Sequence, residues 1–532
     1  MKKRILMLGA GFMQGVAIRA ARERGWEVIA VDGNPEAVCR NLADAFEPID
    51  LKDIQSLSAF ALKLRREGGL DAVFTAATDF SASVAAVAQA CGLSGHSYEA
   101  ALNASDKLRM RDCFEKANVP SPRFVGIDQS SRSRVRVLMQ GKKISLPVVV
   151  KPVDNMGARG CRKVENESSL DEAIGDAIRY SRSGNVIVEE FMDGPEFSVE
   201  ALVYDGGIHM TGIADRHIFF PPYFIEMGHT IPSCFSEGDI ASIVSAFKKG
   251  VASLGLTSGV AKGDVKLTKN GPMIGEIAGR LSGGYMSGWT FPYSSGIDLT
   301  GAALELAAGI RPVSLIPGKN WTSAERAWIS IPGRVASVSG YEKARALPYV
   351  KDIFPRSYPG DFVSFPLNNV EKCGNCLSSA PERSLAVNAA EEGCRLIFLR
   401  LEPSNPATDA FLLSGAQALS PFPPDAFVLP SDFPADISAG GVAYRPLQLD
   451  TGNGKREKIE ISIPALLFPH LDSVKDWQGR TLRQALTFVC EMEPNLVPVL
   501  NSGTQKDINL YFKALLRGGI QGIVYVYDCA AI

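Results

Sequence analysis

A lysine at the end of an apolar strand, followed by a loop with glycines, could together hold a phosphate group. The stretch is Val148–Lys163, VVVKPVDNMGARGCRK, in which three valines predict a buried strand that ends near Lys151. Gly157 and Gly160 would let backbone N–H groups approach phosphate oxygens, and the ammonium group would add a point charge. The glycine spacing does not fit the P-loop pattern, and a solvated surface lysine is the alternative reading of Lys151.

Two acids embedded in apolar strands could hold a metal ion beside such a phosphate. The strands GVAKGDVKLTK and PMIGEIAGR are joined at Asn270-Gly271, a strong signal for a β-hairpin. The register of this hairpin would bring Asp264 and Glu276 near one another. Two carboxylates are tolerated there when a cation lies between them, and oxygen ligands favour Mg²⁺, which commonly bridges phosphate oxygens. This pair is the best physical argument for nucleotide chemistry.

Other charged residues stand where an anionic ligand could lie. Lys107 falls in the first turn of a predicted helix, where free N–H groups suit an anion, although a solvated lysine fits equally well. Glu189 and Glu190 adjoin between apolar residues and are costly there unless something pairs them. In the strand that follows, Glu196 and Glu200 share a polar face, which meets either solvent or a ligand.

The segment from Ala214 to Ser233, ADRHIFFPPYFIEMGHTIPS, is rich in aromatic residues and prolines, and we expect a loop that faces the substrate. Glu226 and His229 are its candidates for substrate recognition. Three of the five histidines of the chain lie in or near it, yet they lack the ligand spacing of a zinc site. A mobile surface loop is the alternative.

The N-terminal turn GAGFMQG lies between an apolar strand and a helix, and the next strand ends at Asp32. Its glycines follow GxGxxxG with an acid about twenty positions on, so an NAD or FAD site is one reading. The other reading is that glycines here only allow a helix and a strand to pack closely. With a further strand around Val73 and a helix from about Ser81 to Cys91, the pattern predicts an open parallel sheet.

Composition excludes several classes of protein. With 532 residues, 46% of them hydrophobic, the chain can bury several cores, and its net charge of −2 gives no overall field for nucleic acid or an anionic membrane. No apolar run approaches the ~20 residues of a membrane span. Ten scattered cysteines favour a reducing cytoplasm. For the CxxC pair Cys373 and Cys376, a turn with incidental thiols is favoured over a zinc site, because no second pair or histidine is near.

The order and separation of the charged residues resemble those of the ATP-grasp enzymes. The residues that carry the resemblance are Lys107, Lys151 with its glycine loop, the EEFMDGPE segment, Asp264, Glu276 and Arg280. The EMGHTIPS and GRLSGGYMSG segments further resemble the L-amino acid ligase branch, which joins an amino acid to an amine through an acyl phosphate. Purine-pathway carboxylases and formyltransferases share the same domain order.

The resemblance implies that ATP binds here. Lys107 and Lys151 would hold its phosphates, and Glu196 would meet the ribose hydroxyls. The loop at 155–160, with Gly157 and Gly160, would act as a lid that excludes water. The adenine edge would be met by Glu189, Glu190 and Met192.

The resemblance also implies a metal site and a catalytic pair. Asp264 and Glu276 would hold Mg²⁺, or Mn²⁺ in its place, with Lys262 near the transferring phosphate. Arg280 would clamp the phosphate or the acyl group. The family usually has Glu-x-Asn-x-Arg where this chain has Ala278 in place of the asparagine.

The expected fold class is α/β, an ATP-grasp fold with an N-terminal Rossmann-like preATP-grasp domain, a small β-rich lobe and an extra C-terminal α/β or α+β domain. The expected boundaries are 1–100 for the first, 101–310 for the ATP-grasp domain, 311–415 for the lobe and 440–532 for the last. A proline-rich linker precedes the last domain, in which EKIEISIPALLF and GIVYVYD predict strands and TLRQALTFVCEM and KDINLYFKALLRG predict helices.

The function that follows is an ATP-dependent carboxylate–amine ligase that releases ADP and phosphate. We expect a cytoplasmic homodimer that takes a small carboxylate and a small amine and binds neither nucleic acid nor a membrane. One alternative is an ATP-grasp carboxylase or formyltransferase of the purine-biosynthesis type. A second is a nucleotide-binding regulatory protein without turnover, suggested by Ala278. A third is an NAD(P)-dependent oxidoreductase, suggested by Gly9, Gly11 and Gly15.

Overall fold

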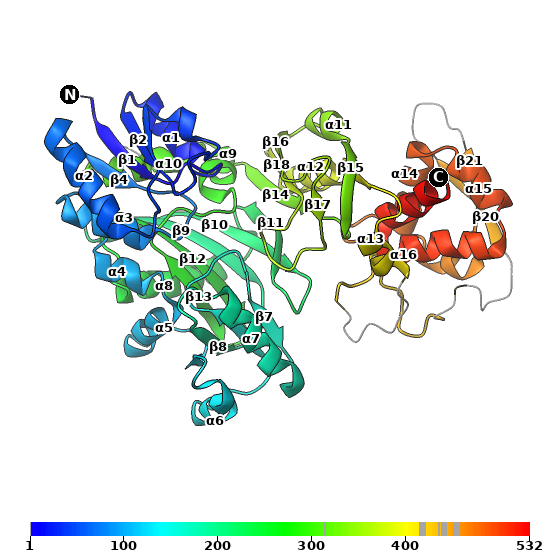
Figure 1. Cartoon of the computed structure of the whole chain (residues 1–532), viewed down its shortest axis with the longest axis horizontal. Coiled ribbons are helices and arrows are strands. Elements are labelled where there is room, and N and C mark those ends of the chain that lie inside the picture. The colour runs from blue at the N-terminus through cyan, green and yellow to red at the C-terminus, as the bar shows by residue number, and fades with distance from the viewer. Residues whose placement is uncertain are drawn as a thin grey trace. The chain divides into compact units, whose positions relative to one another are not determined.

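The computed structural model describes residues 2–312, 315–413, 422–434, 437, 444–450 and 458–531. The chain forms two compact units: unit 1 is Met1–Glu325 with Ser378–Val387, and unit 2 is Arg326–Leu377 with Asn388–Ile532. Figure 1 shows the elements of each unit. Parts of the expected proline-rich linker, residues 421, 435–436 and 438–441, lie outside the described residues. The expected four-domain division stays a prediction.

Unit 1 begins with a parallel sheet in the strand order β3-β2-β1-β4. Alternate residues of its central strands point to opposite faces, and both faces are apolar, as in a sheet covered on both sides. Ile5 and Met7 pack with α1 and α10, while Leu6 and Leu8 pack with α2 and α3. The predicted open parallel sheet is confirmed. Its elements are β1 (Arg4–Leu8), β2 (Glu27–Val31), β3 (Ala45–Glu47), β4 (Ala72–Phe74), α1 (Gly15–Glu23), α2 (Ile54–Gly68), α3 (Ser81–Ala90), α4 (Tyr98–Asn103) and α10 (Leu299–Ala307).

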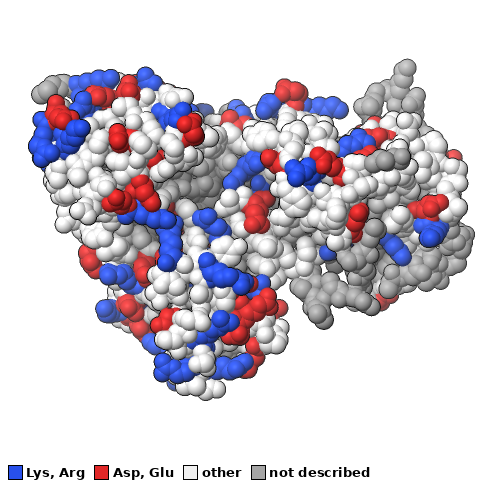
Figure 2. Space-filling model, viewed as in Figure 1, with Lys and Arg blue, Asp and Glu red and all other residues white. Residues whose placement is uncertain are grey.

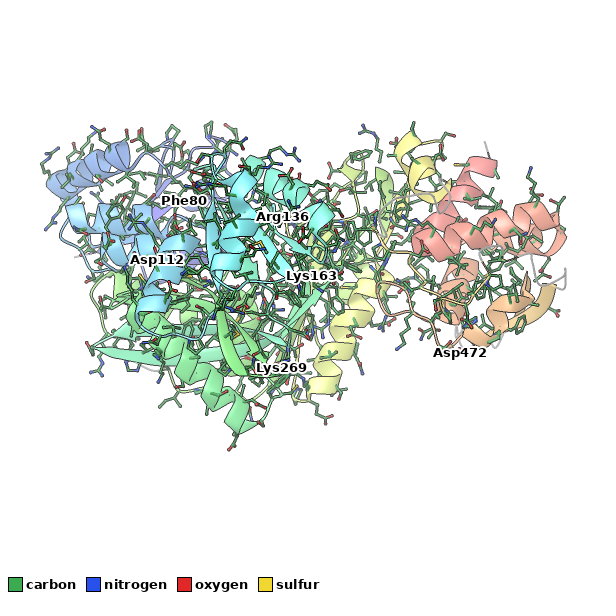
Figure 3. The ribbon with its side chains drawn as sticks, turned by 90° about the horizontal axis from the view of Figure 1, so that it is seen from below. Phe80, Asp112, Arg136, Lys163, Lys269 and Asp472 are labelled. Atoms are coloured by element: carbon green, nitrogen blue, oxygen red, sulfur yellow. The ribbon has the colours of Figure 1, made fainter. Side chains whose placement is uncertain are left out.

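A small antiparallel sheet follows, in the order β5-β8-β6-β7. Val148 and Val150 of β6 and Val186 and Val188 of β8 are fully buried against α6 and α7. This burial explains why the valine run at 148–150 forms a strand and therefore why Lys151 is held in a fixed position at its end. The elements are β5 (Phe124–Ile127), β6 (Val148–Pro152), β7 (Arg162–Val164), β8 (Val186–Glu190), α6 (Val135–Gly141) and α7 (Leu170–Tyr180). Lys163 of β7 and Arg136 of α6 are labelled in Figure 3.

A larger antiparallel sheet carries most of the predicted acids, with β13-β12-β9-β10-β11 as neighbours. The predicted hairpin at Asn270-Gly271 is confirmed, and Asp264 lies opposite Glu276 in its register. Phe197, Val199 and Ala201 of β9 face a core shared with α5 and α8. The elements are β9 (Glu196–Tyr204), β10 (Gly207–Phe219), β11 (Ile225–Ile231), β12 (Gly259–Thr268), β13 (Gly271–Ala278), α5 (Lys107–Lys116) and α8 (Glu237–Ser253); α9 (Phe291–Ser295) follows them.

The expected loop from Ala214 to Ser233 is wrong, because most of it forms the antiparallel strands β10 and β11. The prolines that favoured a loop lie in the connection at 220–224 and directly after β11 at Pro232, where a missing N–H costs no ladder hydrogen bond. The consequence is that Arg216, Glu226 and His229 project from a rigid sheet.

Unit 2 has one apolar core, to which residues on both sides of the segment 378–387 contribute. Its small sheets have the orders β17-β15-β19 and β20-β21. The strands are β15 (Gly333–Ser339), β16 (Val350–Pro355), β17 (Phe362–Val363), β19 (Phe398–Leu401), β20 (Tyr444–Asp450) and β21 (Lys458–Pro464), with β14 (Thr322–Trp328) and β18 (Gly374–Ala380) shared between the units. The helices are α11 (Tyr341–Arg345), α12 (Arg383–Leu396, which begins in unit 1), α13 (Pro406–Leu413), α14 (Leu482–Met492), α15 (Leu496–Ser502) and α16 (Gln505–Ala530).

Two predictions in unit 2 are wrong. GIVYVYD forms the end of α16, where Ile523, Val524 and Tyr525 are buried, so tertiary packing overrides their preference for strands. The pair Cys373 and Cys376 does not form a turn, because Cys376 lies in β18 and both thiols are buried.

Among the described residues, no helix has both the length and the apolar character needed to cross a membrane. On the face drawn in Figure 2, acidic and basic side chains are interspersed.

A buried histidine ties the segment between α3 and α4 to β12 and predicts an acid-sensitive stability. The ring of His96 bonds through Nε2 to the carbonyl of Val260 (2.9 Å), and its Nδ1 accepts from the N–H of Ser258 (3.2 Å). Burial lowers the pKa of His96 from 6.5 to about 4, against the opposing hydrogen bond to Val260. The neutral ring is therefore the form that stabilises the fold.

The contribution of His96 to stability should be complete above pH 6.5 and should fall as the pH approaches 4, by about 3 kcal/mol in total. The unfolded chain takes up the proton in this range and the folded chain does not. Thermal unfolding of the wild type and His96→Gln between pH 4 and pH 7 would check this, because the variant should lose stability less steeply as the pH falls. Identical slopes would contradict the assignment.

Candidate active site

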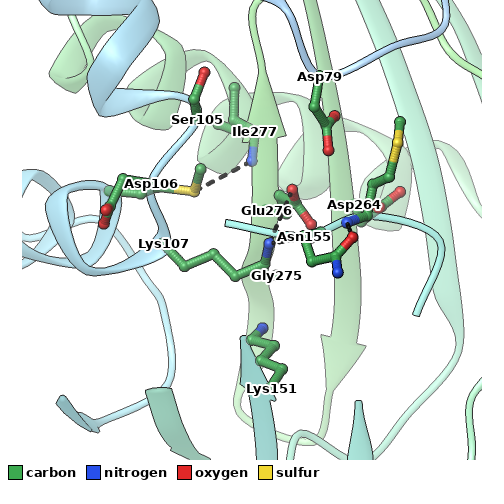
Figure 4. Close-up of polar contacts among 12 residues, drawn as sticks. Asp79, Ser105, Asp106, Lys107, Lys151, Asn155, Asp264, Gly275, Glu276 and Ile277 are labelled. Carbon is green, nitrogen blue, oxygen red and sulfur yellow. Dashed lines mark hydrogen bonds and ion pairs between the residues drawn. The ribbon is translucent and has the colours of Figure 1, made fainter. Parts of the chain in front are cut away.

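Lys107 and Lys151 approach one place from two different elements (Figure 4). Asp106 caps α5 by accepting hydrogen bonds from the first free N–H groups, and this fixes Lys107 in the first turn. The Lys107 ammonium donates to the carbonyl of Asn155 (3.0 Å) and lies 3.6 Å from Glu276 Oε1. The backbone N–H of Lys107 donates to the carbonyl of Val153, just beyond β6. The helix start and the strand that carries Lys151 are thereby joined.

The charge of Lys107 is secured although its side chain is buried. Burial by itself disfavours the ammonium form, but Glu276 and Asp79 more than offset it and raise the pKa of Lys107. The solvated-lysine alternative is therefore wrong for this residue, which is 6% exposed. A buried ammonium flanked by acids is suited to an anionic ligand that arrives with its own metal ion.

The glycine loop after β6 has the backbone conformation that its glycines permit. Gly157 and Gly160 both have positive φ. A Cβ at Gly160 would lie 2.9 Å from the side chain of Tyr180, so packing as well as φ requires glycine there. Since the carbonyl of Asn155 in this loop accepts from Lys107, the loop lies beside the first lysine, where the sequence placed the phosphate.

The two adjacent acids of the EEFMDGPE segment, Glu189 and Glu190, pair with different cations. Glu189 is buried between two cations, with Arg111 Nε 2.7 Å and Lys151 Nζ 2.6 Å from its two oxygens. Burial opposes its ionisation, but Arg111 and Lys151 more than offset this and lower the pKa of Glu189. Glu190 instead pairs with Arg123 at the edge of the small sheet. Met192 follows β8, and its methyl group would lie 3.6 Å from a Cβ placed on Gly275.

Asp264 and Glu276 occupy facing positions on β12 and β13. Asp264 lies 2.5 Å from the ammonium of Lys262 and 2.9 Å from Arg216. Burial opposes its ionisation, but Arg216 and Lys262 offset this and lower the pKa of Asp264. Glu276 is more open, with a side chain that is 38% exposed. Asp264 is thus held as a carboxylate, and Glu276 lies opposite it in the hairpin.

Arg216 is a central residue that the sequence did not single out. Its guanidinium group contacts the carboxylates of Glu196, Glu226 (2.7 Å) and Asp264 (2.9 Å), and it is 10% exposed. Three carboxylates expected to meet ribose, substrate and metal are thus held around one cation. No pattern in its segment, which was expected to be a loop, pointed to this role.

Arg280 follows β13 and is held by an acid from the N-terminal sheet. Its Nη2 lies 3.0 Å from Asp79 Oδ1, in the loop after β4. The segment after Arg280 is fixed by Glu200, which accepts from the N–H of Ser282 (2.9 Å) and from the hydroxyl of Ser287. Glu200 is fully buried, and this burial raises its pKa. At Glu200 this face of β9 therefore contacts the segment after Arg280, and the side chain meets neither solvent nor a ligand.

His229 does not share these contacts. Its side chain is 2% exposed, with Nε2 2.6 Å from the Thr290 hydroxyl and Nδ1 3.2 Å from Glu325. Glu226, by contrast, joins the group around Arg216 and lies near Gly284 of the segment after Arg280, where an added Cβ would be 3.7 Å from Glu226 Oε1. The two substrate candidates therefore occupy different environments.

The N-terminal glycine turn is filled by the chain itself. Gln14 Oε1 accepts from the N–H of Gly11 (3.1 Å), and Cβ atoms on Gly9 or Gly11 would press on the Gln14 side chain. Asp32 is the acid that would bind the ribose of a dinucleotide, and it instead accepts a hydrogen bond from the N–H of Ala10 (2.9 Å). These contacts support the interpretation that the glycines allow close packing of the helix and the strand.

The donors present fit one magnesium ion. Asp264 and Glu276 offer carboxylate oxygens on facing positions, and Mg²⁺ is commonly bound by one or two carboxylates with phosphate oxygens completing its shell. Within the described part of the chain, no group of three or more His, Cys, Asp or Glu is placed to hold a metal ion. A bound nucleotide would have to supply the remaining oxygens.

Comparison with known proteins agrees with this geometry. Residues 144–288 match the family model of the ATP-grasp domain, and residues 327–402 match that of the L-amino acid ligase C-terminal domain 2. The chain is 28% identical over 332 residues to carnosine synthase 1 from Gallus gallus. The aligned region covers 58% of this chain and 36% of that protein. The chain thus spans about a third of that relative's length.

Solved structures show the same fold. The L-amino acid ligase from Bacillus licheniformis has a TM-score of 0.66 at 20% identity, over 75% of this chain and 99% of that one. The phosphoribosylglycinamide synthetase from Anaerococcus prevotii has a TM-score of 0.60 at 22% identity, over 76% and 100%. The expected α/β ATP-grasp fold class is confirmed. The chain therefore has the ATP-grasp fold, with a match to the ATP-grasp domain at residues 144–288 and a match to the L-amino acid ligase C-terminal domain 2 at residues 327–402.

Proposed function

We propose that this protein uses ATP to join a small carboxylate to a small amine, forming an amide bond through an acyl phosphate and releasing ADP and phosphate. The observation that carries the proposal is that two lysines and two facing acids converge. Lys107 lies 3.6 Å from Glu276, Asp264 faces Glu276, and Lys151 approaches from β6. Lysines beside a carboxylate pair are the groups that phosphoryl transfer requires, because positioning and charge neutralisation supply most of its catalysis.

In this proposal the nucleotide lies between the two antiparallel sheets of unit 1. Lys107 and Lys151 bind its phosphates, the loop with Gly157 and Gly160 covers them, and Glu196 binds the ribose. The adenine lies against the segment of Glu189, Glu190 and Met192. Because the side chains of Glu189 and Glu190 are already paired with cations, backbone groups of this segment would contact the base.

The first step transfers the γ-phosphoryl group to an oxygen of the carboxylate substrate, and ADP leaves. Mg²⁺ held by Asp264 and Glu276 would supply positive charge at the phosphate oxygens. Lys262, 2.5 Å from Asp264, lies where it can neutralise the transferring group. Arg280, oriented by Asp79, would bind the phosphate or the acyl oxygen as charge develops there.

In the second step the amine attacks the carbonyl carbon of the acyl phosphate. The C–N bond forms, the C–O bond to phosphate breaks, and the amine loses a proton. Glu226 would hold the substrate amine, because it lies beside the segment after Arg280 and shares Arg216 with Asp264. The match to the L-amino acid ligase C-terminal domain and the likeness to a carnosine synthase support amino acids as both substrates. We further propose that the molecule is a homodimer.

The test is ADP release measured with the purified full-length protein, ATP, Mg²⁺ and pairs of amino acids. ADP should form at least about tenfold faster with an acid and an amine together than with either alone, and mass spectrometry should detect the amide. ATP binding without ADP release under any pair would favour the nucleotide-binding regulatory alternative. ADP formation with bicarbonate or formate as the acid would favour the purine-pathway type of enzyme, whose fold is also similar.

A further inference from the structure

Arg111, which no comparison or motif singled out, belongs to a buried group of three charges that includes Lys151. This group, called here the buried triad, is Arg111, Glu189 and Lys151. Arg111 Nε lies 2.7 Å from Glu189 Oε1, and Lys151 Nζ lies 2.6 Å from Glu189 Oε2. Glu189 therefore uses a separate oxygen for each cation.

The buried triad has a net charge of +1, because it contains two cations and one carboxylate. Glu189 stays ionised because the two cations lower its pKa against the effect of burial. The side chains of Arg111, Glu189 and Lys151 are 0%, 2% and 15% exposed, so only Lys151 reaches the surface of the site. The surplus charge is consequently presented at the Lys151 ammonium.

Arg111 is fixed from a second side. Its Nη2 donates to the carbonyl of Gly275 (2.6 Å) on β13, next to Glu276. It lies one helical turn after Lys107 on the same face of α5, and the two side chains therefore reach the site together. Arg111 thus links β8 of the small sheet to β13 of the large one and holds Glu189 at a set distance from Lys151.

We propose that Arg111 is a positioning residue that neutralises Glu189, so that Lys151 keeps its positive charge for a nucleotide phosphate. The inference rests on the proposed ATP site. Without Arg111, Lys151 and Glu189 would form a neutral pair, and the ammonium would have to leave the buried Glu189 carboxylate to bind phosphate. Arg111 itself does not touch the nucleotide.

The test follows the net charge of the triad through four forms of the full-length protein. The triad carries +1 in the wild type, 0 in Arg111→Met, 0 in Lys151→Met and +1 again in the double variant Arg111→Met/Glu189→Gln. Isothermal titration at low ionic strength should give an ATP Kd about 10 to 100 times weaker in the two neutral forms. The double variant should return to within about fivefold of the wild type.

Adenosine distinguishes a phosphate effect from a damaged site. Since it carries no phosphate, its Kd should stay within about threefold across the four forms. Thermal unfolding of each form reports whether the fold is retained, and the one charge that the double variant keeps in the triad is that of Lys151, the member that reaches the surface of the site.

Equal ATP affinity in Arg111→Met and the wild type would overturn the inference. So would a double variant as weak as Arg111→Met, since Arg111 would then act through packing and not through the charge of Glu189. Those outcomes leave the proposed function intact. A wild type that binds no ATP would overturn the proposed function and the inference with it.

Discussion

Replacing Glu276 with glutamine should lower kcat by about 100-fold or more, because the proposal gives this carboxylate a share in the metal ion and in the charge of Lys107. The fold should tolerate the change. The side chain of Glu276 is 38% exposed, and its ion pair with Lys107 is long, at 3.6 Å. An exposed, loosely paired carboxylate contributes little to stability, and Asp79 remains in the variant to balance the charge of Lys107. We therefore expect Glu276 to matter for activity more than for stability.

The measurement is steady-state ADP release over a range of Mg²⁺ concentrations, together with thermal unfolding. Glu115→Gln is the matched control, because Glu115 is a 62% exposed glutamate of α5 that pairs with Lys142 at 3.0 Å, outside the residues assigned to the site. The control should keep full activity, and both variants should unfold within about 2 °C of the wild type. Turnover in Glu276→Gln within a few-fold of the wild type would remove Glu276 from the site.

Most of what the sequence could foresee rests on local rules. The valines at 148–150, the Asn270-Gly271 turn and the helix start at Lys107 each depend on a few residues, and each forms the predicted element. Hairpin register then places Asp264 opposite Glu276 without any knowledge of the rest of the fold. These local rules explain why Asp264, Glu276 and both lysines could be placed on their strands and helix from the sequence.

What the sequence could not foresee depends on contacts between distant segments. Arg111 meets Glu189 across 78 positions, and Arg280 meets Asp79 across 201. Periodicity within one helix or strand carries no information on such partners. Arg216 was missed for the same reason, since its importance comes from three acids on three other stretches of chain.

Glycine and proline residues led to wrong predictions of turns and loops where packing explains the residue. The CxxC around Gly374 was expected to turn, yet Gly374 begins β18. A Cβ there would overlap the ring of Trp328, so packing requires the glycine. The prolines at 221 and 222 were taken as marks of a long loop, but they occupy only the short connection between β10 and β11. A glycine or proline thus signals a local constraint, and the constraint can be a neighbouring side chain.

Replacing Arg216 with methionine should destabilise unit 1 and abolish turnover. Methionine keeps much of the side-chain volume but leaves the carboxylates of Glu196, Glu226 and Asp264 without their shared cation. Removing one partner from a buried charge group costs about 3–5 kcal/mol, so the midpoint of thermal unfolding should fall by about 5–10 °C near pH 8. Arg311→Met, in an ion pair whose residues are 74% and 63% exposed, should change it by less than about 2 °C.

The pH dependence of this loss separates charge from packing. In Arg216→Met, burial and mutual repulsion should raise the folded-state pKa of the three carboxylates above their unfolded values. Groups with a raised folded pKa stabilise the protein at low pH and lose that contribution as the pH rises. The difference between variant and wild type should therefore shrink from pH 8 to pH 5, and Arg216→Met/Asp264→Asn should recover part of it at pH 8. A difference that is the same at both pH values would mean that Arg216 acts through its volume, and the charge array at the centre of the proposed site would lose its support.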